Sequence, residues 1–491
     1  MDESKGARVC VTVSAGTMRE LRLRRDAVRG ADLVEMRLDA ACDPDPEAAV
    51  EGRRTPVIVT CRPTWEGGAF AGSEDERRRL LRRASDAGAD YIDIEWKAGF
   101  DDLIALRQGR GIVLSHHDFQ GVPADLAGRA RAMQSTRAEV VKIAVKAERL
   151  TDNLRLLDLQ RVVPSVVGVA MGVAGLPSRI LATRFGWRWT YAGDREEVGQ
   201  LTVDRLLDEF GFRRLTADTA LFGVVGRPVS HSLSPALHNR AYEAESIDAV
   251  YLPLEAADAD DFLAFADVFP IAGASVTAPY KEVLMARVAR RDSLTDRVGA
   301  LNTVRRVDGV WHARNTDIEG FRASLAGHDA ARNGRAAVLG TGGAARAVVL
   351  ALGDRAASIT VYGRDVERAQ RVAGLVGGAG RASPPKGGTW DILVNATPVG
   401  THPDCDATPV DARLLGGGLV YDLVYNPTRT RLLREAEAAG CATVGGLEML
   451  VAQAAAQFEW WLGRRAPVAI MREAAESRLA QLYSADSPDT P

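Results

Sequence analysis

Residues 226–239, GRPVSHSLSPALHN, follow a strand-like ALFGVVG and precede a helix-like segment, close to the middle of the 491-residue chain. They separate two halves whose sequence patterns differ. Ser232 and Ser234 are two positions apart, so both hydroxyls would face one side of an extended segment and could grip a carboxylate. Ser234 before Pro235 is also typical of a helix N-cap, and on this stretch alone capping is the simpler interpretation. The residues on either side decide between the two.

The composition excludes several classes of protein. The formal net charge is −3 with acidic and basic residues intermixed, so no basic face for nucleic acid is expected. No apolar run is long enough for a membrane span, and the polar start MDESKGAR does not resemble a signal peptide. The five cysteines are scattered, which favours small core residues in a cytoplasmic protein and no metal site. We expect a small-molecule ligand and a monomer or homodimer.

The first half alternates short β-branched runs with polar loops and stretches rich in Ala, Leu and Arg. Eight strand candidates begin near residues 9, 32, 56, 91, 111, 140, 164 and 187. Each is followed by a helical pattern, as in DERRRLLRRASDAG. This rhythm predicts an α/β fold, a (β/α)8 barrel over residues 1–216.

In such a barrel the chemistry lies at the C-terminal ends of the strands. The polar residues expected there are Glu35, Arg37, Arg62, Glu66, His117, Lys142, Arg179 and Gln200. Lys142 alternates with Val141 and Ile143 in VVKIAV, so it should face the barrel interior with Val140 and Ala144. A desolvated lysine beside arginines is a competent nucleophile for a ketone, whereas a structural ion pair explains it equally well. A lone histidine at a strand end, such as His117, is more often structural.

Residues 9–200 resemble type I 3-dehydroquinate dehydratases through DLVEMRLDA, VTCRPTWEGG, DIEW, SHHDF, KIAV and LPSRI, in that order. The resemblance implies that Lys142 forms a Schiff base with the ketone of 3-dehydroquinate. It implies that His117 removes the α-proton and helps to expel water, while Glu66 orients His117. Arg179 would pair with the substrate carboxylate. The substrate hydroxyls would be bound by Glu35, Arg37, Arg62 and Gln200.

One segment departs from this family. Its members usually carry a Ser-Ala-Pro-Gly-Gln lid after the eighth strand, whereas here GDREEVGQ keeps Gly199 and Gln200 and has Glu196 in place of the serine. Negative charge near a carboxylate substrate predicts either a different lid position or an impaired dehydratase. An active dehydrogenase that carries an impaired barrel is therefore an alternative.

The second half, residues 217–491, also places polar residues at the ends of apolar runs. Thr277 and Lys281 follow GASV, while Asn302 and Asp317 occur in GALNTV and ARNTDIEGF. A surface ion pair is the simpler interpretation of Lys281 and Asp317 taken alone. Together with the two serines and the asparagine, they favour a site for a polyhydroxy acid.

The segment AAVLGTGGAARAVVLAL is typical of a strand, a glycine-rich turn and a helix, and so of a Rossmann-type lobe. Such a turn lets the backbone approach a pyrophosphate at the helix N-terminus. The next strand, SITVYGR, follows about 20 residues later and brings Arg364 to the expected position of the ribose phosphate of NADP. Asp365 could instead accept from a ribose hydroxyl, so some use of NAD stays open. We expect this dinucleotide-binding lobe over 332–446 and a substrate lobe over 219–325 plus 447–484.

Residues 221 to about 463 resemble shikimate dehydrogenases through these motifs and through DILVNATPVGT, LVYDLVYNP and GGLEMLVAQAAAQFEWWLG. The resemblance implies that Lys281 and Asp317 form the catalytic pair, which relays a proton as hydride moves between substrate and NADP. The substrate would be held by Ser232, Ser234, Thr277, Asn302, Tyr425 and Gln453. The cofactor would be contacted by Gly340, Gly342, Gly343, Ala344, Arg364, Asn395 and Thr397.

The two resemblances concern consecutive reactions, from 3-dehydroquinate through 3-dehydroshikimate to shikimate. They predict a bifunctional enzyme of aromatic amino acid biosynthesis, with a Schiff-base syn-dehydration followed by a reversible reduction by NADPH. One rival is a quinate dehydrogenase that uses NAD, which the serine pair disfavours. Another is a ligand-sensing regulator, in which we would expect Lys142, His117, Lys281 and Asp317 to have been lost.

Overall fold

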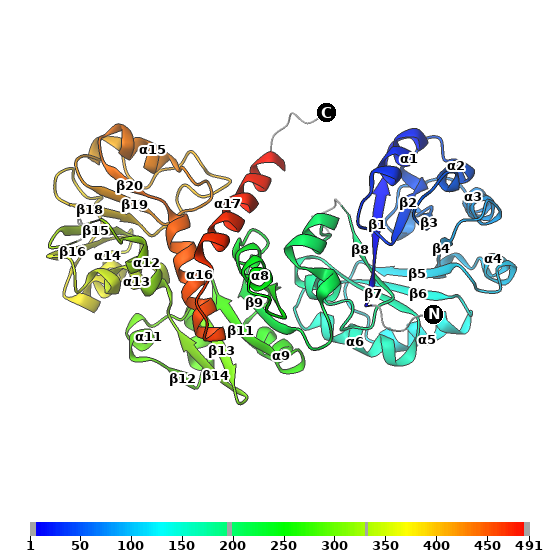
Figure 1. Cartoon of the computed structure of the whole chain (residues 1–491), viewed down its shortest axis with the longest axis horizontal. Coiled ribbons are helices and arrows are strands. Elements are labelled where there is room, and N and C mark those ends of the chain that lie inside the picture. Colours follow the sequence, from blue (N-terminus) through cyan, green and yellow to red (C-terminus); the bar gives the residue numbers. More distant parts are fainter. Residues whose placement is uncertain (1–5, 194–198, 329–331, 486–491) are drawn as a thin grey trace. The chain divides into compact units, whose positions relative to one another are not determined.

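The computed structural model describes residues 6–193, 199–328 and 332–485 (Figure 1). By its internal contacts the chain divides into two compact units, Met1–Ala220 with Leu252–Pro270, and Leu221–Tyr251 with Ile271–Pro491. The boundary expected between residues 216 and 217, and the lobe boundaries within the second half, stay predictions. Glu196 lies outside the described residues.

In the described part of the first unit, eight parallel strands form one sheet in sequence order, and β1 pairs with both β2 and β8. Arg188 N donates to Val166 O at 3.0 Å, which links the start of β8 to β7. The predicted (β/α)8 architecture and its eight strands are confirmed. The strands are β1 (Arg8–Ser14), β2 (Leu33–Arg37), β3 (Val57–Thr60), β4 (Tyr91–Glu95), β5 (Ile112–Asp118), β6 (Val140–Lys146), β7 (Val166–Met171) and β8 (Trp189–Ala192).

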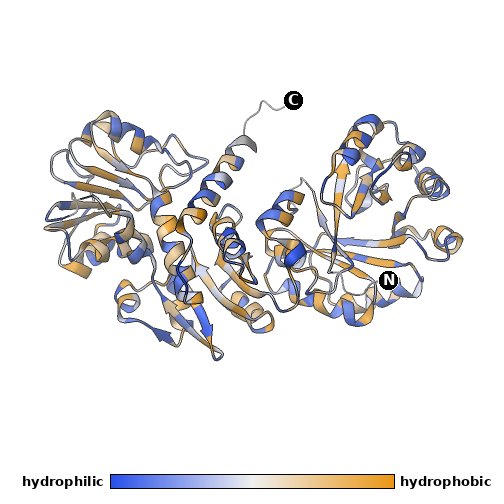
Figure 2. Ribbon diagram, viewed as in Figure 1, coloured by the Kyte–Doolittle hydropathy of each residue, from blue (hydrophilic) through white to orange (hydrophobic). Residues whose placement is uncertain are grey.

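Helices follow these strands on the outside of the barrel (Figure 1). They are α1 (Met18–Ala27), α2 (Pro46–Val50), α3 (Glu74–Asp86), α4 (Asp101–Leu106), α5 (Leu126–Ser135), α6 (Asp152–Val162) and α7 (Leu176–Ile180). Arg205–Glu209 forms a π-helical turn. Figure 2 shows hydrophobic residues along the strands and hydrophilic residues on the outward helix faces.

Side chains alternate along each barrel strand, so every second residue faces the interior. Val140 and Ala144 belong to one buried interior cluster with Cys10, Val113 and Trp189. Lys142 lies between Val140 and Ala144 on the same face of β6, as predicted from the alternation. The strands therefore place Lys142 next to the buried apolar cluster of the barrel interior.

The second unit begins with a mixed sheet of order β10-β9-β11-β13-β14-β12. Its strands are β9 (Ala220–Gly226), β10 (Ala249–Glu255), β11 (Ile271–Val276), β12 (Arg290–Arg291), β13 (Thr303–Val307) and β14 (Val310–Arg314). The helices along this part of the chain are α8 (Ser234–Ala244), α9 (Ala259–Val268), α10 (Tyr280–Val283), α11 (Ser293–Val298) and α12 (Asp317–Ser324). Of these, α9 belongs to the segment Leu252–Pro270, which groups with the first unit. The last helices, α16 (Gly446–Leu462) and α17 (Val468–Ala485), return to this sheet and share its core around Phe222, Leu237 and Phe458.

A second sheet of this unit is parallel throughout, with the order β17-β16-β15-β18-β19-β20, which is the 3-2-1-4-5-6 order of dinucleotide-binding folds. Its strands are β15 (Arg335–Leu339), β16 (Ser358–Tyr362), β17 (Ala379–Arg381), β18 (Ile392–Asn395), β19 (Leu419–Asp422) and β20 (Ala442–Val444). Its helices are α13 (Gly343–Leu352), α14 (Val366–Ala373) and α15 (Arg431–Ala438). The predicted Rossmann-type lobe is confirmed.

The structure corrects one local expectation at the serine pair. Ser234 is the first residue of α8 and not its N-cap, because Leu233 occupies the cap position in a helical conformation with no side-chain cap bond. Ser232 Oγ accepts from Ser234 N at 3.3 Å, so the segment is a turn and not extended. Within the described ranges, no helix combines the length and apolarity needed to cross a bilayer.

Candidate active sites

A cavity of about 140 Å³ opens at the C-terminal ends of the barrel strands. All eight polar residues predicted for this end line it, namely Glu35, Arg37, Arg62, Glu66, His117, Lys142, Arg179 and Gln200. Tyr191, Thr12 and Phe119 also contribute to its wall. Residues from seven different strands or strand ends thus converge on one small space.

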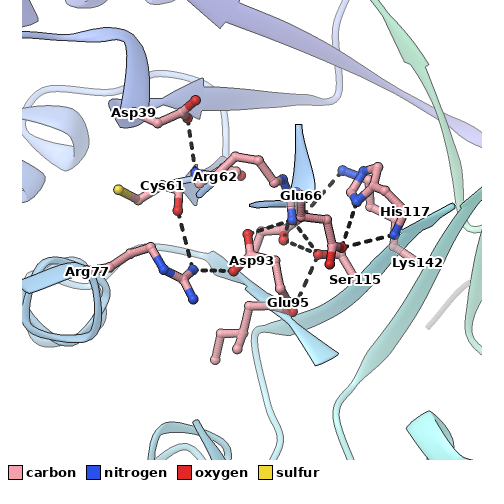
Figure 3. Close-up of polar contacts among 12 residues, drawn as sticks. Asp39, Cys61, Arg62, Glu66, Arg77, Asp93, Glu95, Ser115, His117 and Lys142 are labelled. Atoms are coloured by element: carbon pink, nitrogen blue, oxygen red, sulfur yellow. Dashed lines mark hydrogen bonds and ion pairs between the residues drawn. The ribbon is translucent and has the colours of Figure 1, made fainter. Parts of the chain in front are cut away.

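Lys142 is 5% exposed, and its ammonium pairs with the buried carboxylate of Asp93 (Figure 3) and with that of Glu35. Its Nζ is 3.2 Å from Glu35 Oε1 and 3.3 Å from Asp93 Oδ2. The ring of Tyr191 covers Nζ at 4.2 Å from the ring centroid, a cation–π contact. The sequence predicted arginines and Glu35 at this end of the barrel and left an ion pair of Lys142 open, and the structure shows such pairs; the sequence analysis missed both Asp93 and Tyr191.

Asp93 is fully buried, and its carboxylate makes ion pairs and hydrogen bonds with several neighbours. Arg62 Nη2 lies 2.9 Å from Asp93 Oδ1, and Ser115 Oγ donates to the same oxygen at 2.6 Å. Burial acts to raise the pKa of Asp93, but Arg62 and Lys142 outweigh it and hold that pKa well below its usual value. Asp93 therefore stays ionised beneath the lysine. Arg62 also pairs with Glu95 at 2.7 Å, so its charge is matched within the protein.

His117 and Glu66 form the hydrogen-bonded pair that the resemblance implies. Glu66 Oε1 lies 3.1 Å from His117 Nδ1 and accepts from His117 N at 2.9 Å, while Glu66 Oε2 has no partner among the described residues. Burial raises the pKa of Glu66 to about 7. Burial, followed by the charges of Arg62 and Lys142, lowers the pKa of His117 well below its usual value. The imidazole is therefore neutral at pH 7 and can accept a proton.

Arg179 differs from the other arginines of the cavity. It is 3% exposed, its Nη1 donates only to Tyr191 O at 3.4 Å, and its Nε has no partner among the described residues. No carboxylate within the described ranges pairs with it, and burial lowers its pKa to about 10. Arg37, in contrast, pairs with Asp39 at 2.7 Å. An unmatched buried guanidinium is costly, which fits the binding of an anion at this place.

The second unit contains a cavity of about 320 Å³ between its two sheets. The residues predicted for the substrate line it, namely Ser232, Ser234, Thr277, Lys281, Asn302, Asp317, Tyr425 and Gln453. Ala344, from the first turn of α13, closes the cavity on the side of the dinucleotide-binding lobe. Both serines face the cavity although their segment is a turn.

Lys281 and Asp317 form a close pair at the edge of this cavity. Lys281 Nζ donates to Asp317 Oδ2 at 2.7 Å, and Asn302 Nδ2 donates to Asp317 Oδ1 at 2.8 Å. The side chain of Asp317 is 8% exposed, so the pair is not the surface ion pair of the simpler interpretation. Both oxygens of one carboxylate are therefore fixed.

The glycine-rich turn fits a dinucleotide. Gly340 has φ +110°, and a Cβ there would lie 2.8 Å from Ala396 O, so only glycine suits this turn. Gly342 occupies the N-cap of α13 and Gly343 its first turn. Asn395 Oδ1 accepts from Thr397 N and Oγ1 at 3.0 and 2.6 Å, which orders the neighbouring loop. The turn leaves room for a pyrophosphate at the helix N-terminus.

Arg364 follows β16 and is exposed to solvent. It does not line the substrate cavity. Asp365 caps α14, because its Oδ1 accepts from Arg368 N at 2.9 Å. Its carboxylate is thus engaged with the protein backbone, which weakens the case for a ribose hydroxyl bound there. Arg368, in the first turn of α14, is a second basic side chain that the sequence analysis did not single out. Among the described residues, no group of three or more His, Cys, Asp or Glu side chains is arranged to hold a metal ion.

Comparisons with known proteins match the first and second halves of the chain to different families. The family model of type I 3-dehydroquinase matches residues 9–215. The models of the shikimate dehydrogenase substrate-binding domain and of the shikimate 5'-dehydrogenase C-terminal domain match residues 224–304 and 446–476.

Individual relatives extend this picture. The bifunctional 3-dehydroquinate dehydratase/shikimate dehydrogenase of Arabidopsis thaliana chloroplasts is 35% identical over 94% of this chain and 82% of its own length. The NADP(+) shikimate dehydrogenase of Halobacterium salinarum is 42% identical over 53% of this chain and 99% of its own. A solved shikimate dehydrogenase in complex with NADP+ superimposes with a TM-score of 0.50 at 31% identity, over 54% of this chain and 97% of its own. With matches to both halves in the same order as in the Arabidopsis protein, the chain belongs to the family of bifunctional 3-dehydroquinate dehydratase/shikimate dehydrogenases.

Proposed function

We propose that the chain carries out both reactions of its family, each at one of the two cavities, with the residues named below. The chain is a bifunctional enzyme of the shikimate pathway, a lyase and an NADP-dependent oxidoreductase. Its first reaction dehydrates 3-dehydroquinate to 3-dehydroshikimate. Its second reduces 3-dehydroshikimate to shikimate, reversibly. The observation that carries the first assignment is one cavity lined by Lys142, the His117–Glu66 pair and Arg179, a buried guanidinium that pairs with no carboxylate among the described residues.

In the barrel, Lys142 loses a proton and attacks the ketone of 3-dehydroquinate as an amine. The carbinolamine then takes up a proton and releases water, which leaves an iminium. The iminium withdraws electrons from the neighbouring carbon, so the neutral imidazole of His117 can remove its proton. The substrate hydroxyl then leaves as water with a proton returned by His117, and hydrolysis frees Lys142. Arg179 binds the carboxylate, while Glu35, Arg37, Arg62 and Gln200 surround the hydroxyls.

In the second cavity, Ser232 and Ser234 hold the carboxylate of the substrate, and Thr277, Asn302, Tyr425 and Gln453 contact its ring and hydroxyls. NADPH, when bound, supplies the hydride. The groups that would hold it are Gly340, Gly342, Gly343, Ala344, Arg364, Asn395 and Thr397. Lys281, kept in place by Asp317, gives a proton to the oxygen that the reduction creates and takes it back in the reverse direction.

The alternatives have less support. An impaired barrel is disfavoured because Lys142, His117, Glu66 and Arg179 share one cavity, and a regulator is disfavoured because Lys281 and Asp317 are paired in the other. The serine pair supports shikimate over quinate as the substrate. We also propose a cytoplasmic enzyme that is a monomer or homodimer, which light scattering on the purified chain would check.

The experiment that tests the barrel assignment is single-turnover dehydration of 3-dehydroquinate, with borohydride trapping of the adduct and mass spectrometry. Turnover with a trapped adduct on Lys142 is expected. The matched control is Lys142→Met, which should give neither product nor adduct. An enzyme that oxidises shikimate with NADP but neither dehydrates 3-dehydroquinate nor traps an adduct would contradict the barrel assignment.

A further inference from the structure

A buried polar cluster lies behind the Lys281–Asp317 pair. It consists of Tyr251, Ser275, Thr303 and Gln457, each at most 7% exposed. Ser275 and Gln457 also line the substrate cavity. Buried polar groups are costly unless hydrogen bonds satisfy them, so the arrangement of these bonds needs a reason.

From the amide nitrogen of Gln457, a series of hydrogen bonds leads to the Lys281–Asp317 pair, and each residue in it donates to the next. Gln457 Nε2 donates to Thr303 Oγ1 at 3.0 Å. The Thr303 hydroxyl donates in turn to Asn302 Oδ1 at 2.8 Å, where Thr316 N also donates at 2.7 Å. The oxygen of the Asn302 amide is thereby fixed on this side, so its nitrogen faces Asp317.

This orientation determines how Asp317 meets Lys281. Asn302 Nδ2 donates to Asp317 Oδ1, which leaves Oδ2 to accept from Lys281 Nζ. If the Asn302 amide turned over, its oxygen would face a carboxylate oxygen and repel it. The position of the Lys281 ammonium therefore depends on an amide that Thr303 and Gln457 hold from behind.

The bonds on the other side keep Gln457 itself from turning. Its Oε1 accepts from Ser275 Oγ at 2.7 Å, and Ser275 Oγ accepts from Tyr251 Oη at 2.5 Å. An amide oxygen can only accept, so the hydroxyl protons of Ser275 and Tyr251 must point toward Gln457 along this chain. The Tyr251 ring is in turn stacked on His238, with centroids 4.4 Å apart.

We propose that Gln457 is a positioning residue of the dehydrogenase reaction, which places Lys281 through Thr303, Asn302 and Asp317. The inference rests on the proposed roles of Lys281 and Asp317. Gln457 lies one helical turn after Gln453 on α16, so both side chains project to the same side of that helix, but its polar atoms are bonded within the protein. Its contribution is therefore to the position of the proton donor and not to substrate affinity.

The test is Gln457→Met, which keeps the approximate volume and removes both amide bonds. We expect kcat for shikimate oxidation to fall by about 10- to 100-fold, because small displacements of catalytic groups cost rates of this order. The KM for shikimate should not change, because the polar atoms of Gln457 are bonded within the protein, and the pH at which kcat is half-maximal should shift. The matched control is Gln370→Met on α14, because the amide of Gln370 bonds the backbone of Gly378 and Gly380; this variant should retain the wild-type kcat.

Thr303→Val provides an independent check, because it breaks the same chain one bond later. If Gln457 acts through Thr303, the double variant should be no slower than the slower single variant. Additive losses, or an unchanged kcat in Gln457→Met, would overturn the inference. Should Gln457→Met fail to fold, Thr303→Val alone decides it, and an unchanged kcat there would also overturn it. A folded wild-type chain that does not oxidise shikimate would instead contradict the proposed function.

Discussion

At Lys142, the two flanking carboxylates suit the positively charged stages of the proposed Schiff-base reaction. The resting ammonium and the iminium both carry positive charge at Nζ, within 3.3 Å of Glu35 and Asp93. The face of the Tyr191 ring adds a third favourable contact. Fixed groups of opposite charge placed where positive charge persists stabilise the intermediate without having to reorganise.

Asp93→Asn should therefore slow formation of the Schiff base. We expect a loss of about 100-fold in single-turnover dehydration, with less adduct trapped by borohydride, because one of the two charges facing Nζ is removed. Ser115→Ala is the control, since it removes a bond to Asp93 and keeps the charge; it should lose much less. An adduct that forms at the wild-type rate in Asp93→Asn would refute this role.

The His117–Glu66 pair predicts a particular pH dependence. Burial raises the pKa of Glu66 to about 7, whereas burial and the charges of Arg62 and Lys142 lower the pKa of His117 well below its usual value, so the imidazole stays neutral. As pH rises through 7, Glu66 becomes a carboxylate and better polarises His117, so kcat/KM for dehydration should rise with a midpoint near 7. Glu66→Gln should lose this rise, and its activity should approach that of wild type only at low pH. The same midpoint in both enzymes would assign the rise to another group.

At the scale of elements, the approach of α12 to α16 brings together Asp317, a proposed catalytic residue, and Gln453, a proposed substrate-binding residue. Asp317 starts α12 and Gln453 lies on α16. Gly320 permits their contact, because a Cβ there would lie 2.8 Å from Gln453 Cβ and 2.9 Å from Gln453 N. The missing side chain thus allows the two helices to bring Asp317 and Gln453 to one cavity.

Gly320→Ala should force these helices apart. We expect a destabilisation of about 1–3 kcal/mol, as for other overpacked contacts, and a lower kcat for shikimate oxidation. Thermal unfolding and initial rates would measure both effects. Gly374→Ala is the matched control, since a Cβ at that position meets no atom within 4 Å and should cost nothing. Equal melting temperatures for wild type and Gly320→Ala would show that α16 adjusts freely.

The junction between β16 and α14 should determine coenzyme preference. Arg364→Ala is expected to raise the KM for NADP by about 10- to 100-fold, the loss of one charge-assisted contact to a phosphate, and to leave the KM for NAD unchanged. Asp365→Ser retains an N-cap for α14, so it should keep the wild-type preference. A shift toward NADP in Asp365→Ser would show that the carboxylate acts on the cofactor after all.

Across the whole chain, sequence patterns predicted the fold and both cavities because strand ends and glycine turns have local signatures. The alternation that placed Lys142 inside the barrel also applies to Asp93 in YIDIE, and would have found it. Gln457 could have been found from its spacing to Gln453. Tyr191 could not, because an inward aromatic residue is typical of any barrel core. The prediction that Ser234 is an N-cap was wrong, because capping preferences do not determine which residue starts a helix.

Having both sites on one chain predicts that 3-dehydroquinate and NADPH alone should yield shikimate, with one NADPH oxidised for each molecule of substrate consumed. Because the two sites share no residue, changes at one should leave the other unaffected. Lys142→Met should therefore stop shikimate formation from 3-dehydroquinate but not from added 3-dehydroshikimate. Lys281→Met should accumulate 3-dehydroshikimate, seen by its enone absorbance, at the wild-type rate of dehydration. If Lys142→Met also lost its reduction of 3-dehydroshikimate, the two halves would not be catalytically independent.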